Sequence, residues 1–253
     1  MAGSGRGRRD LSAVALTQGT LLGGRVHYAQ AEEGFRSGIE PVLLAASVPA
    51  RPGNLVLEAG CGAGAGLLCL ASRTGAGGIG ADVEPALVDI ARLNATANGF
   101  TTLRFVTIDI TAYRTEKRFD HGFANPPYHP AELPRSPDEK RDRAKRSTPD
   151  LLERWTAALA RLVRDNGTVT LSLPASRLPE ALGAYSAHRL GSLVVYPLWP
   201  REGRAAKLVL LQGRVGGHAA PVLAAGLVLH GGEGFSREAE AVLRDGCALR
   251  LRA

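Results

Sequence analysis

Residues 54–66 read NLVLEAGCGAGAG, and this stretch decides the fold. A short apolar strand, Leu55–Leu57, runs into a turn that carries glycine at positions 60, 62 and 64, and a helical run follows. A strand, a glycine turn and a helix in this order open a doubly wound sheet. Because glycine lets the backbone approach a ligand closely and the helix offers free N–H groups, the turn predicts a binding site at the end of the strand.

Outward from this turn, strands and helices alternate along the chain. Pro49 and Pro52 close an apolar helix before the turn, and Asn98 with Gly99 closes another after it. The alternation predicts an α/β fold with a doubly wound, mostly parallel seven-stranded sheet and helices on both faces. Helices are expected over 39–48, 67–73, 86–97 and 149–164, and strands over 55–57, 77–82, 103–110, 119–125, 168–173, 192–197 and 207–212.

Length and composition fit one large domain. The 253 residues are 45% apolar and 22% charged, which excludes collagen, low-complexity disorder and a disulfide scaffold. We expect residues 1–17 to be a basic disordered tail and residues 18–253 to form a single domain. The three cysteines show no zinc spacing, so no metal site is expected. No apolar run reaches the roughly 18 residues of a membrane helix and no signal peptide is apparent, so we expect a cytoplasmic protein.

Asp82 follows the glycine turn at the spacing of a nucleotide site. It lies 22 residues after Gly60, at the end of the next expected strand, where a carboxylate can accept both hydroxyl hydrogens of a ribose. The turn also satisfies the dinucleotide pattern G-x-G-x-x-A, so a nicotinamide cofactor and S-adenosylmethionine both stay open. Glu58 favours S-adenosylmethionine, because a carboxylate there repels a pyrophosphate and suits the ammonium of a methionine moiety. Asp109 ends the third strand, placed either to accept from an adenine amino group or to cap a helix.

The stretch Asn125-Pro126-Pro127-Tyr128 is the most specific motif in the chain. An exocyclic amino group on a base is a poor nucleophile, because its lone pair is delocalised into the ring. The Asn125 side-chain oxygen and the Pro126 carbonyl can accept its two hydrogens and so aim the lone pair outward. The prolines fix the direction of that carbonyl, and Tyr128 offers a face for stacking a planar group. The alternative is a proline-rich turn that ends a strand.

A net charge of +7 favours a polyanionic partner, although an Arg-rich composition gives the same sign without one. Basic residues gather directly after the Asn-Pro-Pro-Tyr motif, at the mouth of the expected site. We interpret them as a loop that contacts nucleic-acid phosphates, the alternative being a solvated charged loop. The candidate RNA-binding residues are Arg135, Lys140, Arg141, Arg143, Lys145 and Arg146.

Together, EAGCGAG, Asp82, Asp109 and NPPY resemble the class I S-adenosylmethionine-dependent methyltransferases that modify planar amino or amide nitrogens. The stretches 21–48, 197–212 and 227–243 narrow the resemblance to the bacterial tRNA(Val) adenine-N6 methyltransferase family, over about residues 18–245. The resemblance implies a Rossmann-like fold, S-adenosyl-L-methionine as cofactor and tRNA as partner. It also implies N6-methylation of an unpaired adenine just 3′ of the anticodon.

The same resemblance assigns roles to individual residues. Glu58 and the glycines hold the methionine portion of the cofactor, Asp82 its ribose and Asp109 its adenine, while Asn125 and its neighbours hold the target base. The cofactor-binding candidates are Arg36, Ser37, Glu58, Gly60, Cys61, Gly62, Gly64, Asp82, Val83, Asp109, Ile110 and Asn125. The catalytic candidates are Asn125, Pro126, Pro127 and Tyr128. Cys61 has the alternative role of a small filler.

The sequence departs from the family at Ala63, where many relatives carry Thr or Ser, and at Glu58, where Asp is commoner. NPPYH also resembles the ribosomal RNA guanine-N2 methyltransferases, which keeps that substrate as an alternative. A protein glutamine-N5 methyltransferase acting on release factors is a second alternative, disfavoured because only about 53 residues precede the first expected strand. A protein that binds RNA without catalysis is disfavoured by Asn125 and Asp82, and a nicotinamide oxidoreductase by NPPY.

Overall fold

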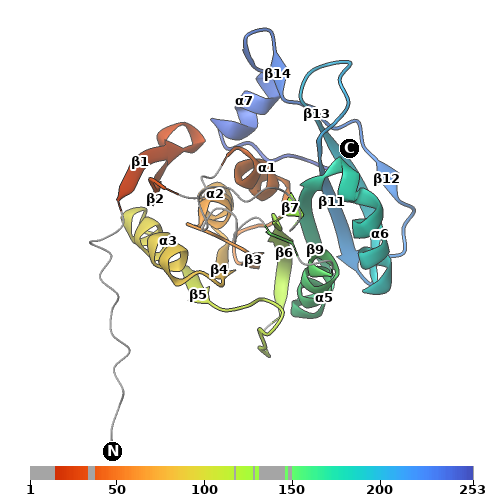
Figure 1. Ribbon diagram of the computed structural model, residues 1–253, viewed down its shortest axis with the longest axis horizontal. Coiled ribbons are helices and arrows are strands. Elements are labelled where there is room, and N and C mark those ends of the chain that lie inside the picture. The colour runs from red at the N-terminus through yellow and green to blue at the C-terminus, as the bar shows by residue number, and fades with distance from the viewer. Residues whose placement is uncertain are drawn as a thin grey trace, which may run out of the picture.

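The computed structural model describes residues 15–33, 38–116, 118–127, 129–130, 146–147 and 150–252. Its centre is a nine-stranded sheet in the order β12–β10–β11–β9–β6–β3–β4–β5, with β13 beside β10 (Figure 1). The helices are α1 (Glu40–Ser47), α2 (Ala65–Thr74), α3 (Pro85–Ala97), α5 (Leu151–Leu162), α6 (Leu178–Ala187) and α7 (Arg237–Leu243). The sheet strands are β3 (Leu55–Ala59), β4 (Gly77–Asp82), β5 (Leu103–Thr107), β6 (Phe119–Ala124), β9 (Val163–Pro174), β10 (Leu190–Trp199), β11 (Leu208–Val215), β12 (Val222–Leu223) and β13 (Leu227–Val228). Outside it lie β1 (Leu16–Leu21), β2 (Val26–Ala31), β7 (His129–Pro130), β8 (Arg146–Ser147), β14 (His230–Gly231) and β15 (Gly234–Phe235).

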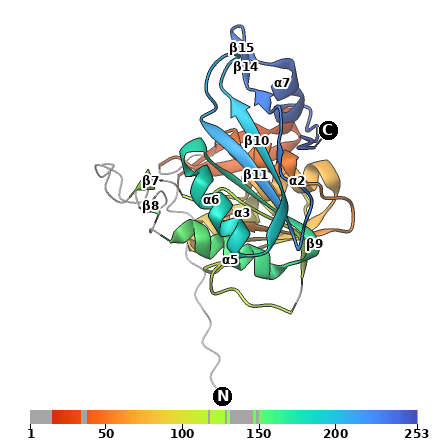
Figure 2. The ribbon, with the colours of Figure 1, turned by 90° about the vertical axis from the view of Figure 1, so that its right-hand side faces the viewer.

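The order of the strands reverses between β3 and β6. β4 and β5 follow β3 in parallel toward one edge, whereas β6 and β9 continue the parallel sheet on the other side of β3. β11 and β10 then pair antiparallel, and Figure 2 shows these long strands beside α6. In open α/β sheets, ligands bind outside the carboxyl ends of the strands at such a reversal. This switch point brings the glycine turn after β3 next to the motif after β6.

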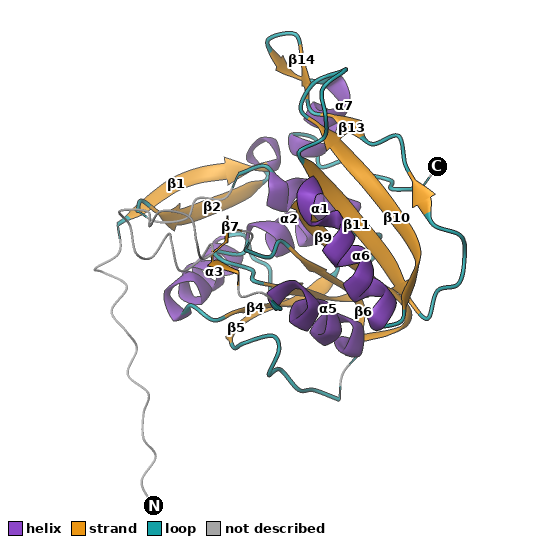
Figure 3. Ribbon diagram, turned by 45° about the vertical axis from the view of Figure 1, so that its right-hand side comes forward, coloured by secondary structure: helices purple, strands orange, loops and turns teal. Residues whose placement is uncertain are grey.

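Apolar side chains fill both faces of the sheet, which confirms the expected α/β architecture. Helices α1, α2 and α3 cover one face, and α5 and α6 cover the other (Figure 3). Successive side chains of a strand point to opposite faces, so Val56 joins the first core while Leu57 joins the second. Both are fully buried, and each such side chain stabilises the fold by roughly 1.5–3 kcal/mol.

The expected elements are present, with shifted ends. The helix expected over 149–164 is α5, which ends at Leu162 because Val163 already pairs with Phe119 in the sheet. Strand β9 therefore begins five residues before the predicted 168, at a β-branched residue that suits a strand. The sheet has nine strands rather than seven because the two-residue strands β12 and β13 pair with β10.

Several elements were not predicted from the sequence. The N-terminal hairpin β1–β2 is one, and helices α6 and α7 are others. Leu16 pairs with Ala31 and Thr17 with Gln30, so two residues assigned to the tail belong to this hairpin. Within the described residues, no helix is both long enough and apolar enough to cross a membrane.

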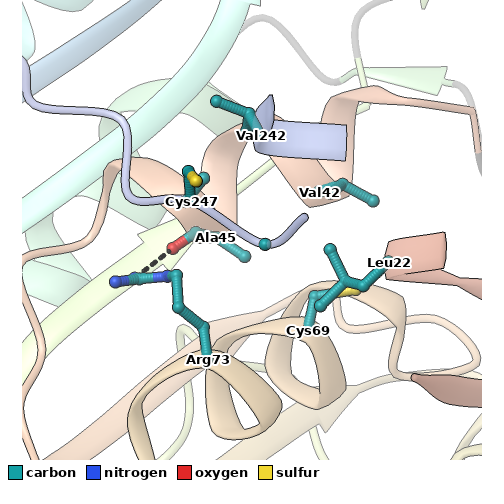
Figure 4. A pocket seen from close by; sticks show the side chains of 9 residues that line it. Leu22, Val42, Ala45, Cys69, Arg73, Val242 and Cys247 are labelled. Carbon is teal, nitrogen blue, oxygen red and sulfur yellow. Dashed lines mark hydrogen bonds between the residues drawn. The ribbon is translucent and has the colours of Figure 1, made fainter. Parts of the chain in front are cut away.

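The C-terminal segment packs against α1 and α2. The Leu249 N–H donates to the Ala46 carbonyl (2.9 Å), and Arg73 donates to the carbonyls of Ala45 (2.9 Å) and Val48 (2.8 Å). A gap of about 10 Å³ remains between these elements, with Cys69 and Cys247 among its lining (Figure 4). A gap of this size holds one water at most, so it is a packing defect rather than a ligand site.

Candidate cofactor and methyl-transfer site

The glycine turn needs glycine at each of its three positions. Gly60, Gly62 and Gly64 have φ angles of 67°, 53° and 91°, in the left-handed region where side chains are strained. The N–H groups of Gly60 and Cys61 both donate to the Ala81 carbonyl (2.8 and 3.1 Å), which ties the turn to β4. No atom lies within 4 Å of where a Cβ on Gly62 would stand, so this glycine leaves open space for a ligand.

Asp82 joins the glycine turn to the loop after β4. Its Oδ2 atom accepts from the Gly62 N–H (2.8 Å) and its Oδ1 atom from the Glu84 N–H (2.9 Å). Burial raises the pKa of this carboxyl, while the N–H donors oppose the rise. The next residue, Val83, is 67% exposed, although it is a large apolar side chain. An exposed valine beside a fixed carboxylate suits a ligand that has a ribose and a flat apolar face.

Glu58 is buried under the first turn of α2. Its Oε2 atom accepts from the Leu67 N–H (2.8 Å), and its other oxygen occupies the space that a Cβ on Gly66 would fill. Burial raises the pKa of Glu58 to about 8, with a further contribution from the charge of Asp82. The carboxyl is therefore largely protonated at neutral pH in the absence of a cation. Its expected role toward an ammonium stays a prediction.

Asp109 and Ile110 lie after β5. The Oδ1 atom of Asp109 accepts from both the N–H and the hydroxyl of Thr111 (2.8 Å each), so this carboxylate closes a turn. Its alternative role as a cap is close to the observed one, although no helix follows. Ile110 is buried in the core under α5, so only its backbone is available to a ligand.

Cys61 occupies the interior of the glycine turn. It is 5% exposed, and its Sγ atom lies 3.6 Å from the Gly62 carbonyl. Burial raises the pKa of this thiol well above its ordinary value, which keeps it protonated. These observations favour the role of a small filler.

Asn125 lies directly across the switch point from the glycine turn. Ala124, the last residue of β6, pairs with Ala59, the last residue of β3, so the residues that follow them, Asn125 and Gly60, are neighbours. Asn125 is partly exposed, whereas Pro126 is buried, which fixes the backbone on which the amide side chain stands. The backbone thus places Asn125 beside the glycine turn.

Comparison with known proteins decides the class of this site. Residues 56–138 match a family model described as a methyltransferase domain. The fold is similar to that of a predicted O-methyltransferase from Agrobacterium tumefaciens, with a TM-score of 0.69 and 21% identity over 84% of this chain and 99% of that one. Residues 56–138 are thus a methyltransferase domain, and the likeness to the solved structure is one of fold. The domain match and the fold support S-adenosyl-L-methionine as its cofactor.

Two sequence relatives of this methyltransferase carry the name tRNA1(Val) (adenine(37)-N6)-methyltransferase. The one from Flavobacteriaceae bacterium (strain 3519-10) is 35% identical over 101 residues, which are 39% of this chain and 44% of the relative. The one from Bacteroides thetaiotaomicron is 27% identical over 167 residues, which are 64% of this chain and 70% of the relative. The chain thus spans between 44% and 70% of the length of these relatives.

Some residues of the predicted site lie outside the described residues. These are Arg36, Ser37, Tyr128, Arg135, Lys140, Arg141, Arg143 and Lys145. Arg146 is described by its backbone alone, in β8, where it pairs with His129 of β7. Because β7 directly follows the NPPY motif, the end of the basic segment at Arg146 lies beside that motif.

Trp155 is a site residue whose position the sequence did not reveal. Its place on the apolar face of a helix predicts a core residue, and it does pack against the second core. Its indole edge also reaches the glycine turn, where a Cβ on Gly60 would stand 2.7 Å from the ring atom Cη2. The ring thus closes one side of the switch point and excludes any larger residue at position 60.

Asn94 and Asn98 of α3 are further residues that sequence reasoning missed. The Asn94 side chain accepts from the Ala29 N–H (2.8 Å) and donates to the carbonyls of Ala29 (2.9 Å) and Ala63 (3.0 Å). Asn98 bonds both backbone groups of His27 in the same manner, at 2.8 and 2.7 Å. The two amides act as a strand partner for β2, and Asn94 links this hairpin to the glycine turn. An asparagine pair at i and i+4 is a weak signal that surface helices also give.

Among the residues that the structure describes, no group of three or more histidine, cysteine or acidic side chains gathers in a way that could hold a metal ion.

Proposed function

We propose that this protein transfers a methyl group from S-adenosyl-L-methionine to N6 of an unpaired adenine in tRNA, the adenine just 3′ of the anticodon. The observation that carries the proposal is the contact of two motifs at the switch point. Asn125 and Pro126 directly follow β6, and the turn that starts at Gly60 directly follows β3, the neighbouring parallel strand. The names of the two tRNA methyltransferase relatives support the choice of tRNA and adenine.

The residues after β6 prepare the amino group for reaction. The Asn125 Oδ1 atom would accept one N6 hydrogen and the Pro126 carbonyl the other, which would withdraw the nitrogen lone pair from conjugation with the ring and direct it toward the methyl donor. When bound, S-adenosyl-L-methionine supplies a methyl group on a positively charged sulfur, a leaving group that needs no strong base. The N6–methyl bond forms as the sulfur–methyl bond breaks, and the surplus amino proton passes to water. The protein contributes position and orientation rather than general-base strength.

Several features of the chain support an unpaired base as substrate. Extruding an adenine from an anticodon loop requires less free energy than opening a duplex, which suits an enzyme built around one catalytic domain. Tyr128 follows Asn125 by three residues in sequence and is proposed to supply the aromatic face for stacking. The same reasoning leads us to propose a cytoplasmic enzyme, because tRNA is processed there.

Transfer of labelled methyl from S-adenosyl-L-methionine tests the proposal. Total tRNA, total ribosomal RNA and a release factor are offered in parallel, and the products are digested and identified by mass. We expect label in tRNA as N6-methyladenosine. Methylguanosine in ribosomal RNA, or methylglutamine in the release factor, would keep the cofactor and overturn the substrate.

A further inference from the structure

A second concave surface lies outside the switch point, on the side of α5 that faces the segment after β5. It is a hollow of about 530 Å³ between α5, the start of the β5–β6 segment and the end of α6. Figure 1 shows where these elements lie. We name it the arginine hollow, because three of its lining residues are arginines. Its lining consists of Thr111, Arg114, Arg154, Ala157, Ala158, Arg161 and His188.

The arginines of the hollow are held by neutral groups. Arg114 donates to the carbonyls of Thr111 (2.9 Å) and Tyr113 (3.0 Å), and Arg161 donates to the same Tyr113 carbonyl (3.0 Å). Arg154 donates to the Thr111 hydroxyl (3.2 Å). Each guanidinium has five N–H donors, so most of them stay available after these bonds. The side chains are thereby oriented without being neutralised.

A fourth arginine adds to this positive charge. Arg118 donates to the Arg161 carbonyl from outside the hollow. Partial burial lowers the pKa of Arg161, and the charges of Arg114 and Arg118 lower it further. Within the described part of the chain, no carboxylate forms an ion pair with any of these four arginines. Such a cluster is electrostatically unfavourable by itself, and a bound anion would relieve the repulsion.

His188 completes the lining at the end of α6. Its Nε2 atom is buried and has no hydrogen-bond partner among the described residues. The carboxylate of Glu153 lies 3.8 Å from it, on the side of α5 next to the hollow. The carboxylate of Asp109 accepts from Thr111, which also lines the hollow.

The hollow connects to the methyl-transfer site at two points. Thr111, whose hydroxyl accepts from Arg154, also donates to Asp109, a candidate cofactor-binding residue after β5. Trp155, the next residue on α5, contacts the position of Gly60. A polynucleotide that places one base at the switch point therefore has its backbone within reach of the hollow.

We propose that the arginine hollow binds phosphate groups of the nucleic-acid substrate and so anchors its backbone while the target base enters the switch point. This inference rests on the proposed function for its choice of ligand. Arginine suits the task, because its planar fork binds a phosphate with two parallel hydrogen bonds. The basic segment between 135 and 146 and the hollow would then contact the backbone at different places.

The test compares two triple variants of the full-length protein. The first, Arg114→Gln/Arg154→Gln/Arg161→Gln, removes the charges of the hollow. The matched control, Arg237→Gln/Arg244→Gln/Arg250→Gln, removes three exposed charges from the C-terminal segment, which starts at α7, far from α5 in Figures 1 and 2. Binding of bulk tRNA is measured for each at several salt concentrations. Affinity of the hollow variant should fall about 10- to 100-fold at low salt, and its salt slope should decrease by about two.

A purely structural role for these arginines makes different predictions. It moves the thermal midpoint and leaves the salt slope of the surviving folded protein unchanged. Arg114→Lys/Arg161→Lys separates the two roles, because lysine restores the positive charge without reproducing both carbonyl bonds. We expect lysine to restore most of the salt slope and the KM for tRNA. Calorimetric titration with S-adenosyl-L-methionine checks that cofactor affinity is kept within about twofold of wild type.

The outcomes distinguish this inference from the proposed function. If the hollow variant binds tRNA like the control, with an unchanged salt slope, the hollow is not a phosphate site even when tRNA is methylated. If wild type binds tRNA through the arginines and methylates none, the proposed function fails while the hollow stands. If wild type binds no tRNA at all, both are overturned.

Discussion

The loops at the switch point and the neighbouring arginine hollow carry side chains of opposite charge type. On the β3–β4–β5 side, the carboxyl groups of Glu58, Asp82 and Asp109 each accept hydrogen bonds from backbone N–H groups. On the α5 side, Arg114 and Arg161 donate to backbone carbonyls. Backbone groups thus orient carboxyl groups in one region, the acidic half, and guanidinium groups in the other, the basic half.

This difference matches the two ligands that the proposed reaction must bring together. S-adenosyl-L-methionine carries positive charges on its sulfur and its ammonium, which carboxylates attract. A cation beside Glu58 would also favour the ionised form of this buried carboxyl. A tRNA is a polyanion, and the basic half attracts its backbone. Separating the two fields lets each ligand bind without neutralising the groups intended for the other.

The largest effect is expected where the two halves meet, at Asn125. Asn125→Ala removes an acceptor for the target amino group and should lower kcat for methyl transfer on the order of 10³-fold. Affinity for S-adenosyl-L-methionine should stay near the wild-type value, measured by calorimetric titration. Asn125→Asp keeps an acceptor oxygen and should retain more activity than the alanine variant. Wild-type turnover in Asn125→Ala would remove this residue from the mechanism.

The next effect concerns the acidic half alone. Asp82→Ala removes a carboxylate that is expected to bind the ribose, and it should weaken cofactor binding about 10- to 100-fold. Asp82→Asn keeps one acceptor for a backbone N–H and should lose less. Because burial raises the pKa of Asp82, cofactor affinity should fall in acid sooner than an ordinary aspartate predicts. Equal affinities of the three proteins across the pH range would contradict this role.

A smaller effect should come from Asn94, which links the β1–β2 hairpin to the glycine turn. Asn94→Ala leaves the backbone groups of Ala29 and the Ala63 carbonyl without partners, and it should reduce the free energy of unfolding by about 2 kcal/mol. Cofactor affinity should drop several-fold, because the glycine turn loses one of its anchors. Asn98→Ala is the matched control, since it also frees a strand residue but does not touch the turn. A control that weakens cofactor binding as much as Asn94→Ala would break the proposed link.

The most gradual effect is a pH dependence of stability from Glu58, which is spread over several pH units. Its pKa is about 8 in the folded protein against 4.5 for a free glutamate, so the folded state keeps a proton that the unfolded state loses. Stability from this group is fully present below pH 4.5 and is lost as the pH rises toward 8. The slope is about 1 kcal/mol per pH unit at most.

Glu58→Gln should flatten this part of the profile of unfolding free energy against pH, measured by urea denaturation. Glu238→Gln, an exposed substitution on α7, serves as the control and should keep the wild-type profile. Parallel profiles for wild type and Glu58→Gln would show that the buried carboxyl does not titrate in this range.

The positions of the acidic residues at strand ends could be predicted from the sequence, because they lie in continuous motifs, while their roles toward a cofactor stay predictions. The glycine turn, Asp82 and the NPPY motif each follow a strand, and parallel strands bring their carboxyl ends to one edge. The end of α5 was predicted two residues late, because pairing of Val163 with Phe119 overrides the helical pattern. The role of Glu58 stayed open because its burial under α2 depends on tertiary packing.

The basic half could not be predicted from the sequence. The arginine hollow combines residues from 111–114, 154–161 and 188, and no local spacing joins these segments. Arg114 and Arg161 are held by backbone carbonyls, which leave no sequence signal. Asn94 was missed for the same reason, since its partners lie 65 and 31 residues away.

One crossed binding experiment tests the division of the site most directly. Wild type, Asp82→Ala and Arg114→Gln/Arg161→Gln are each titrated with S-adenosyl-L-methionine and, separately, with bulk tRNA. The account predicts that Asp82→Ala loses cofactor affinity and keeps tRNA affinity, while the arginine variant keeps cofactor affinity and loses tRNA affinity. Loss of both ligands in either variant, or of neither in both, would contradict a site built from an acidic cofactor half and a basic nucleic-acid half.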